Sequence, residues 1–155
     1  MFKIESDYLN GERNGKGKEY YDNGKLKFEG EYLNGRKWTG KGYDVINNIV
    51  YNLKNGEGII KEYEENGKLK FEGEYLNGKK NGKGKEYNYD GELEFEGEYF
   101  YGERSGKGKE YYDNGKLKFE GQYIYGKRYG KGKEYNKDGK LEFEGQYRDG
   151  NKVSK

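Results

Sequence analysis

Cysteine, histidine, proline and alanine are all absent from the 155 residues. Without cysteine the chain has no disulfide framework and no thiol nucleophile. Without histidine it lacks the side chain most often used for proton transfer near neutral pH and for metal binding. No apolar run is long enough for a transmembrane helix, and the first ten residues lack the shape of a signal peptide. We therefore expect a cytoplasmic protein.

A large excess of charge of one sign is also missing. The 31 Lys and Arg residues nearly balance the 29 Asp and Glu residues, and the net charge is +2. Lys and Glu alternate within a few residues, so no basic face is expected and nucleic acid is not an expected partner. The three serines, Ser6, Ser105 and Ser154, lie outside nucleophile motifs. The sequence does not exclude a pair of catalytic carboxylates like that of a glycosidase. We predict a protein that is not an enzyme, with no cofactor and no metal site.

Hydrophobic residues make up only 30% of the chain, and more than half of them are Tyr and Phe. Such a composition often indicates disorder. Here the aromatic content of 17% and the balanced charge favour a fold that buries a thin layer of rings. An elongated molecule is the expected result.

A repeat of about 24 residues dominates the sequence. Its Gly-Lys-Gly mark begins at Gly15, Gly40, Gly82, Gly106 and Gly130. The full unit is G-x-G-K-E-Y-x-x-x-G-x-L-x-F-E-G-x-Y-x-x-G-x-x-x. Repetition at this period is typical of repeat architectures, in which each unit packs on its neighbours.

Each unit has the pattern of a β-hairpin. In the first complete unit, residues 18–21 form a short strand, Asp22-Asn23-Gly24 the turn and residues 26–33 the second strand. Asn-Gly supplies the positive φ angles of a tight turn. In the second strand Leu, Phe, Gly and Tyr alternate with Lys and Glu, which predicts an apolar and a solvated face. The predicted fold is all-β, an elongated single-layer antiparallel sheet of tandem hairpins with about thirteen strands.

The glycine of the F-E-G motif lies between two apolar-face residues, for example Gly30 between Phe28 and Tyr32. Glycine inside a strand often indicates close approach by another group. Either a neighbouring ring lies over it, or a β-bulge occurs there.

One segment, residues 36–60, departs from the repeat. It contains the only tryptophan, Trp38, and its hairpin turn is four residues shorter by alignment. Tyr51 aligns with the strand glycine of other units, and Leu53 aligns with their tyrosine. The segment is either a structural adjustment at a bend or void of the sheet, or a docking site for a specific partner.

The recurring pattern resembles the MORN repeat, as in "FEGEYLNGKKNGKGKEY" from Phe71 to Tyr87. Phe stands for the first Tyr of that family's pattern and Tyr for its usual Trp, as in variant repeats of bacterial proteins, some of them antitoxin-like. The resemblance covers nearly the whole chain. It implies one MORN-type domain over residues 1–155, with about six repeats, and an extended sheet that scaffolds protein contacts. It also implies that no catalytic residue belongs to the repeat.

We expect the protein to mediate protein–protein interaction through an aromatic-lined sheet face. Tyrosine suits interfaces because it is large, fairly rigid and amphipathic. The same rings also pack on one another in a one-layer sheet. The partner is a protein or peptide of unknown identity, and edge strands can pair with a second copy. The predicted partner-binding residues are Trp38, Tyr51, Phe71, Tyr75, Phe95, Tyr99, Phe119, Tyr123, Phe143 and Tyr147.

An alternative function is binding to anionic membrane lipids through lysine-rich loops. The candidate residues are Lys79, Lys80, Lys127 and Arg128. Each cation near such a surface contributes about 1 kcal/mol. Neighbouring Glu residues weaken this attraction.

Overall fold

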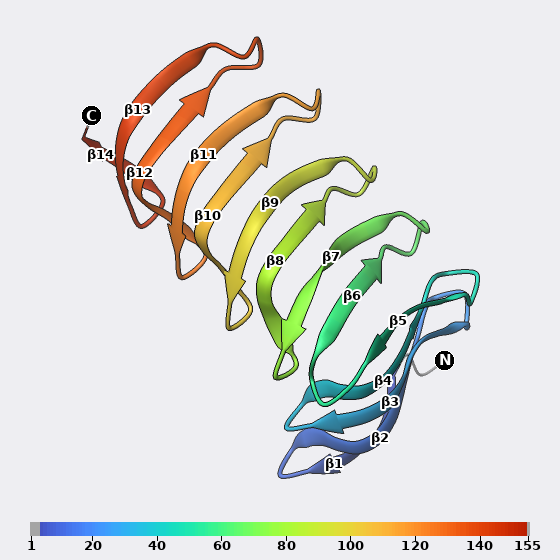
Figure 1. Ribbon diagram of the computed structural model, residues 1–155. Coiled ribbons are helices and arrows are strands. Elements are labelled where there is room, and N and C mark those ends of the chain that lie inside the picture. The colour runs from blue at the N-terminus through green and yellow to red at the C-terminus, as the bar shows by residue number, and fades with distance from the viewer. Residues whose placement is uncertain (1–3, 155) are drawn as a thin grey trace. The chain divides into compact units, whose positions relative to one another are not determined.

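The structure is a computed structural model that describes residues 4–154, and the described residues form strands and turns without a helix (Figure 1). The expectation of an all-β antiparallel fold is confirmed. In this range there is no helix with the length and apolar character needed to cross a membrane. Two compact units make up the chain, Met1–Lys79 and Lys80–Lys155.

The first unit contains a five-stranded antiparallel sheet in the order β1-β2-β3-β4-β5, followed by an antiparallel pair, β6 with β7. The strands follow one another in chain order because each is joined to the next by a short turn. Their bounds are β1 (Ile4–Leu9), β2 (Glu12–Tyr20), β3 (Leu26–Leu33), β4 (Arg36–Tyr43), β5 (Ile49–Leu53), β6 (Gly58–Tyr63) and β7 (Leu69–Leu76).

In the second unit, each strand from β8 to β14 pairs antiparallel with the next one along the chain, and the series does not close on itself (Figure 1). The first strand of each hairpin is longer than the sequence predicts, because it begins directly after the preceding turn. The bounds are β8 (Lys79–Tyr87), β9 (Leu93–Phe100), β10 (Glu103–Tyr111), β11 (Leu117–Ile124), β12 (Lys127–Tyr135), β13 (Leu141–Arg148) and β14 (Asn151–Ser154).

Two kinds of turn alternate along the chain. Turns such as Asn34-Gly35 have two residues with positive φ angles, 49° and 81°, which is the geometry of a tight type I′ hairpin. In the turns between the two strands of a repeat, only one residue has a positive φ angle, a glycine such as Gly115 with 84° or, in the irregular segment, Asn47 with 70°. The expectation that Asn23 supplies a positive φ angle is therefore wrong, because that turn is a longer one that ends in a left-handed glycine.

Glycines of neighbouring strands face one another across each sheet. Gly108 pairs with Gly97 on one side and with Gly121 on the other. A Cβ atom on Gly108 would lie 2.7 Å from the ring of Phe95 and 2.8 Å from the ring of Tyr123. Rings therefore lie directly over the glycine row, as the first of the two interpretations expects. Register shifts also occur nearby, for example between Gly121 and Tyr123.

The irregular segment changes the strands of its hairpin rather than the turn. Tyr43 pairs with Ile49, six residues on, just as Tyr20 pairs with Leu26. The expectation of a shortened turn is wrong, because it is the strands that are shorter: β4 and β5 have eight and five residues, whereas β2 and β3 have nine and eight. As a result Tyr51 lies opposite Gly42, where the regular hairpin pairs Phe28 with Glu19.

The ring of Tyr51 fills the space that this exchange opens. It stacks on Phe28, with ring centroids 6.5 Å apart and planes at 17°. A Cβ atom on Gly42 would lie 1.8 Å from the Tyr51 ring, so only glycine fits opposite it. Tyr51 and Leu53 form one buried cluster with Phe28, Tyr32 and Ile60. The described packing favours the structural interpretation of this segment, since β5 and β6 meet there without joining one sheet.

Candidate functional site

The aromatic rings of the second unit form a continuous ladder. Phe95, Phe119 and Phe143 each contact the Tyr four residues later on the same strand, and Phe95 and Phe119 each contact a Tyr of the following repeat as well. All five contacts are edge-to-face, the arrangement that aromatic quadrupoles favour. In order the rings are Tyr99, Phe95, Tyr123, Phe119, Tyr147 and Phe143, with centroid separations between 5.2 and 5.8 Å.

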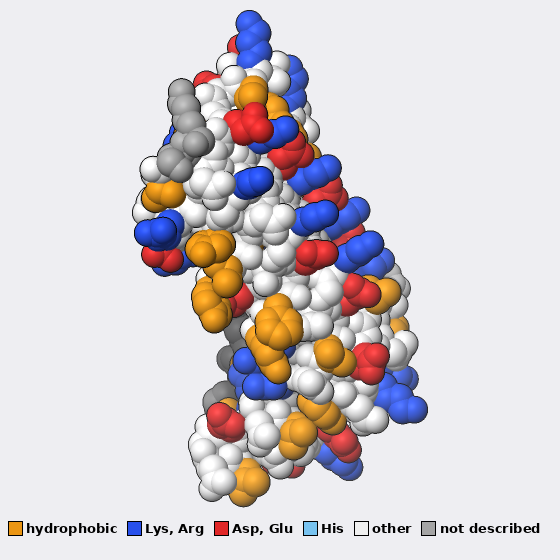
Figure 2. All heavy atoms as spheres, turned by 60° about the vertical axis from the view of Figure 1, so that its left-hand side comes forward, with side chains coloured by type: hydrophobic (Ala, Val, Ile, Leu, Met, Phe, Trp, Pro, Cys, Tyr) orange, Lys and Arg blue, Asp and Glu red, His pale blue; other side chains and the backbone are white. Residues whose placement is uncertain are grey.

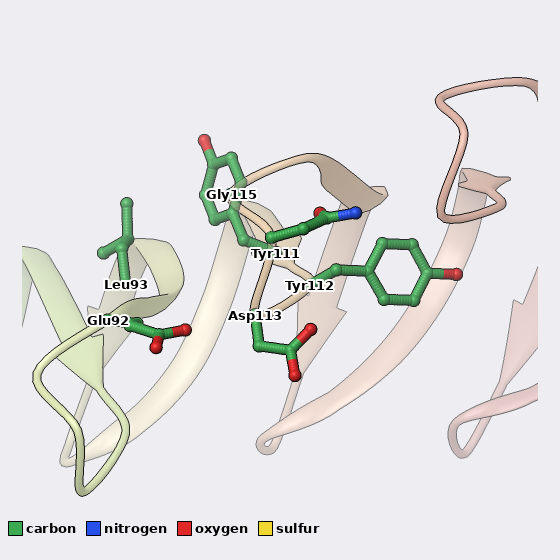
Figure 3. Close-up of a pocket in the computed structure, with 7 residues that line it drawn as sticks. Glu92, Leu93, Tyr111, Tyr112, Asp113 and Gly115 are labelled. Carbon is green, nitrogen blue, oxygen red and sulfur yellow. The ribbon is translucent and has the colours of Figure 1, made fainter.

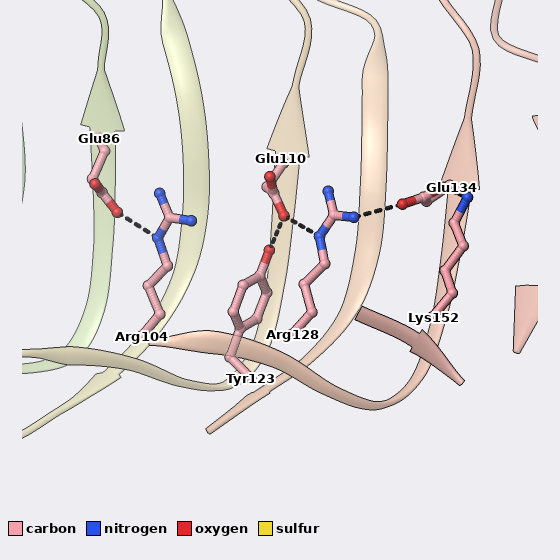
Figure 4. A network of polar contacts seen from close by, with 7 residues as sticks. All are labelled: Glu86, Arg104, Glu110, Tyr123, Arg128, Glu134 and Lys152. Carbon is pink, nitrogen blue, oxygen red and sulfur yellow. Dashed lines mark hydrogen bonds and ion pairs between the residues drawn. The ribbon is translucent and has the colours of Figure 1, made fainter. Parts of the chain in front are cut away.

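A cation lies over each Phe ring of this ladder. The guanidinium carbon of Arg128, on β12, lies 4.0 Å from the centroid of Phe119 on β11. Its Nε donates a 2.8 Å hydrogen bond to Glu110 on β10, and the hydroxyl of Tyr123 donates to the same carboxylate oxygen (Figure 4). Its Nη1 donates a 2.6 Å bond to Glu134. We call this arrangement, a cation crossing a ring to reach a carboxylate two strands away, the ring clasp.

The ring clasp recurs in both units. Arg104 lies 3.9 Å from the centroid of Phe95 and reaches Glu86 at 2.8 Å. Lysine takes the same part elsewhere, which shows that the arrangement needs a long cation rather than a guanidinium. In the first unit, Lys37 lies over Phe28 and forms a 3.2 Å ion pair with Glu19. In the second, Lys152 lies over Phe143 and forms a 2.6 Å ion pair with Glu134.

The electrostatics of the clasp keep its carboxylates charged. Burial by itself raises the pKa of Glu110, but hydrogen bonds from Arg128 and Tyr123 and the Arg128 charge outweigh it, so the pKa lies below its usual value. The pKa of Glu86 is lowered in the same way, because hydrogen bonds from Arg104 and Tyr99 outweigh the effect of burial. Burial and the adjacent Glu110 carboxylate raise the pKa of Tyr123. The hydroxyls of Tyr99 and Tyr123 therefore remain proton donors to a carboxylate.

A second set of tyrosines bonds to glutamates of the preceding repeat. The hydroxyl of Tyr135 donates to Glu120 at 2.7 Å, and that of Tyr43 donates to Glu29 at 2.7 Å. These hydrogen bonds raise the pKa of Tyr135 and of Tyr43 to about 12. Neighbouring hairpins are also joined through the backbone, since the Tyr112 hydroxyl donates to the carbonyl of Tyr135 at 2.6 Å.

Most residues that the sequence predicts as partner-binding lie inside the fold. Trp38, Tyr75 and Phe143 are half-buried. Their part in partner binding stays a prediction, although a partner reaches little of a buried ring. The buried members are Tyr51, Phe71, Phe95, Tyr99, Phe119, Tyr123 and Tyr147.

The four cations predicted for lipid binding have different surroundings. Arg128 is held in the ring clasp between Glu110 and Glu134. The Lys80 ammonium lies 5.7 Å from the centroid of Tyr99. Lys79 is half-buried, and Lys127 is exposed beside a turn. The four therefore do not form one set of equally accessible charges.

A surface that sequence reasoning missed lies along the type I′ turns of the second unit. In two of these turns Tyr101 and Tyr125 occupy the position that Asn or Asp has in the others, each with a φ angle of 50°. A bulky residue in this conformation is strained. Both side chains point to solvent, with 64% and 79% of their surface exposed. The change from Asn-Gly to Tyr-Gly was the available signal.

Other exposed apolar side chains lie on the strands that these turns, and the next one at Asp149-Gly150, join. We call the whole set the turn-edge band. Hydrophobic side chains also gather at the surface in Figure 2, beside rows of Lys and Arg that alternate with Asp and Glu. The band consists of Phe100, Tyr101, Ile124, Tyr125, Tyr129 and Val153.

Backbone hydrogen bonds hold successive turns of the band in line. The N–H of Gly126 donates to the carbonyl of Arg104 at 3.0 Å, and the N–H of Gly102 donates to that of Lys80 at 2.9 Å. The same bond joins Gly150 to Arg128 at 3.0 Å. Each turn is thus tied to the preceding repeat, which fixes the spacing of Tyr101 and Tyr125.

A shallow hollow opens at the opposite turns, between two hairpins of the second unit (Figure 3). It exposes carboxylate and aromatic groups but no nucleophile with an adjacent base. No group of three or more Asp and Glu residues suited to a metal ion occurs within residues 4–154. The hollow is lined by Glu92, Leu93, Tyr111, Tyr112, Asp113, Asn114 and Gly115.

Comparison with known families gives matches over more than half of the chain. The model of the MORN repeat variant matches residues 13–34, 56–77, 104–125 and 128–149, and the model of the MORN repeat matches residues 71–92. Three of the variant matches begin at Arg13, Arg104 and Arg128. No curated protein matches the chain significantly.

Proposed function

The chain belongs to the MORN repeat family, and on that basis we propose that it is a non-catalytic repeat scaffold that mediates protein–protein interaction. The observation that carries the proposal is the turn-edge band. Two tyrosines are held there in a strained conformation and exposed, where asparagine would fit without strain. Strain of this kind, combined with exposure, favours a binding role for the side chains.

The binding surface that we propose differs in place from the ring ladder. The ladder rings pack against one another and against the clasp cations, so these contacts stabilise the fold. The ladder contributes to binding by holding the turns in register. Phe143 of the ladder is half-buried and keeps some surface for a partner, as does Tyr75 of the first unit.

The absence of catalysis is part of the proposal. Histidine and cysteine are missing from the sequence. The clasp carboxylates Glu86 and Glu110, which are half-buried, are held ionised by Arg and Tyr, whereas a general acid needs a raised pKa. These features suit structural carboxylates. A cytoplasmic location also stays a prediction.

Membrane binding is the second candidate, and it rests on the exposed Lys127 beside Tyr125. Tyrosine and lysine often occur together at membrane interfaces. Against it, Arg128 is neutralised by two carboxylates, and the exposed acidic residue Glu103 lies two residues after Tyr101.

Affinity capture from a lysate of the source cells tests the proposal. The full chain is compared with a Tyr101→Asn/Tyr125→Asn variant, in which both turns receive the residue that fits their backbone. The matched control is Tyr89→Asn, which removes another exposed tyrosine from the opposite turns. We expect specific proteins to be retained by the parent and the control and lost by the double variant. Equal capture by all three would contradict the proposal.

Vesicle flotation with neutral and anionic lipids separates the two candidates. The scaffold function predicts no flotation with either vesicle. Flotation with anionic vesicles alone, abolished by charge reversal at Lys79, Lys80 and Lys127, would establish the membrane function instead.

A further inference from the structure

We propose that the turn-edge band binds a proline-rich segment of a partner protein in the polyproline II conformation. The inference rests on the proposed scaffold function and names the chemistry of its partner. It depends on three features of the band, which are the spacing of its tyrosines, the groups that they present and the balance of charge around them.

The first feature is the spacing of Tyr101 and Tyr125. They occupy equivalent positions in consecutive type I′ turns, and the bonds from Gly102 and Gly126 to the preceding repeat tie both turns in the same way. Equivalent positions of consecutive hairpins are two strands apart, or about 9.6 Å. A polyproline II helix rises about 3.1 Å per residue with three residues per turn, so every third residue returns to one side after about 9.3 Å. Two prolines three residues apart therefore match the two tyrosines.

The second feature is the chemistry of the exposed groups. Tyrosine offers a flat apolar ring with a hydroxyl at its far end. A polyproline II segment has apolar pyrrolidine rings and no internal hydrogen bonds, so its carbonyl oxygens remain free to accept from such hydroxyls. Phe100 contacts Tyr101 edge-to-face, with centroids 4.5 Å apart, and so supports its ring. Aromatic surfaces of this kind are the usual receptors for proline-rich segments.

The third feature is the charge around the band. The exposed charged residues nearest the turns are Glu103, Lys127, Arg148 and Asp149, two acids and two bases. This balance fits an occupant without net charge and gives no preference for an acidic or a basic one. The 155 residues contain no proline, so a second copy of this chain cannot supply the segment.

Fluorescence anisotropy with a labelled oligoproline peptide of about ten residues tests the inference on the full chain. A Gly-Ser peptide of equal length, uncharged and flexible, is the control probe. We expect the oligoproline to bind and the Gly-Ser peptide not to bind. The Tyr101→Asn/Tyr125→Asn variant should lose at least about tenfold in affinity, as expected for central aromatic contacts. Tyr89→Asn should bind like the parent chain.

Salt and spacing provide further readouts. Binding to an uncharged segment should change little between about 0.1 M and about 1 M salt, whereas binding that depends on charge would weaken strongly. A peptide with prolines at every third position should bind more tightly than one with prolines at every fourth, because only the first matches the turns. Equal binding by these two peptides would overturn the proposed register.

The result also separates this inference from the function on which it rests. If oligoproline does not bind, while the double variant still loses proteins in affinity capture, the polyproline inference is wrong and the scaffold function stands. If oligoproline does not bind and capture is unchanged in the double variant, both fail. Oligoproline binding that survives the double variant would place the site elsewhere and overturn the inference.

Discussion

Arg128 covers Phe119, with its guanidinium carbon 4.0 Å from the ring centroid, while its nitrogens bond Glu110 and Glu134. The arginine thus combines a cation–π contact with two ion pairs. Glycines beneath the ring let it lie close to the backbone, and the cation closes the other side. A sheet with few aliphatic residues obtains a buried core in this way.

Removal of the clasp cation should destabilise the protein. Arg128→Ala uncovers Phe119 and leaves Glu110 without its cation, so we expect a loss of about 2 kcal/mol in the free energy of unfolding, less than for a fully buried pair. Arg128→Lys should cost about half as much, because Lys37 and Lys152 serve in other clasps. Urea denaturation provides the measurement. Lys131→Ala, an exposed cation on the same strand, is the control, and an equal loss there would refute the clasp.

The glycine row should tolerate no side chain. A Cβ atom on Gly121 would lie 2.7 Å from the Phe119 ring and 2.8 Å from the Gly132 backbone, so Gly121→Ala should cost about 2–3 kcal/mol. Gly126→Ala is the comparison, because that position is open but has a φ angle of 80°. Backbone strain alone should lower the free energy of unfolding of Gly126→Ala by about 1 kcal/mol. Thermal or urea unfolding compares the two, and a larger loss at Gly126 would show that ring contact is not the constraint.

Acid should weaken the fold through the clasp carboxylates. The pKa values of Glu86 and Glu110 are lower in the folded protein than the ordinary value of 4.5. Their contribution is therefore complete above about pH 4.5 and is lost as pH falls through the lower, folded values. We expect the free energy of unfolding to decline below about pH 4.5, and to decline less steeply in Glu110→Gln. A flat profile between about pH 3 and about pH 7 would contradict this account.

The strained turn tyrosines should limit stability. Tyr125→Asn replaces a residue that is 79% exposed by one that adopts positive φ angles readily, so the free energy of unfolding should rise by about 1 kcal/mol. The reciprocal change, Asn34→Tyr, should lower it by a similar amount, because Asn34 has a φ angle of 49°. Chemical denaturation of both variants tests the pair. A loss of stability in Tyr125→Asn would mean that the ring supports the fold.

Much of the fold follows from local patterns in the sequence. The alternation around Phe28, Gly30 and Tyr32 predicts the second strand of the hairpin, and β3 has those bounds, Leu26–Leu33. Asn34-Gly35 predicts a tight turn because few other pairs adopt two positive φ angles without strain. These features depend only on neighbouring residues.

The ring clasp was harder to predict because its members come from three strands. Glu110 and Arg128 are 18 residues apart, and among so many interleaved charges they look like part of a solvated face. Their recurrence at the repeat period, on the face of the Phe residues, was the signal that distinguishes them. The position of Tyr51 was also hidden, because the alignment places it at a strand glycine while strand pairing places it opposite Gly42.

The central claim is that the protein has two different sets of tyrosines. One set stabilises the sheet, and the other contacts the partner. Tyrosine footprinting by mass spectrometry, without and with the captured partner, tests it most directly. Free protein should react at Tyr101 and Tyr125 and be protected at Tyr123 and Tyr147. Added partner should protect Tyr101 and Tyr125. Rapid reaction of Tyr123 and Tyr147 in the free protein, or partner protection that spares both turn tyrosines, would contradict the claim.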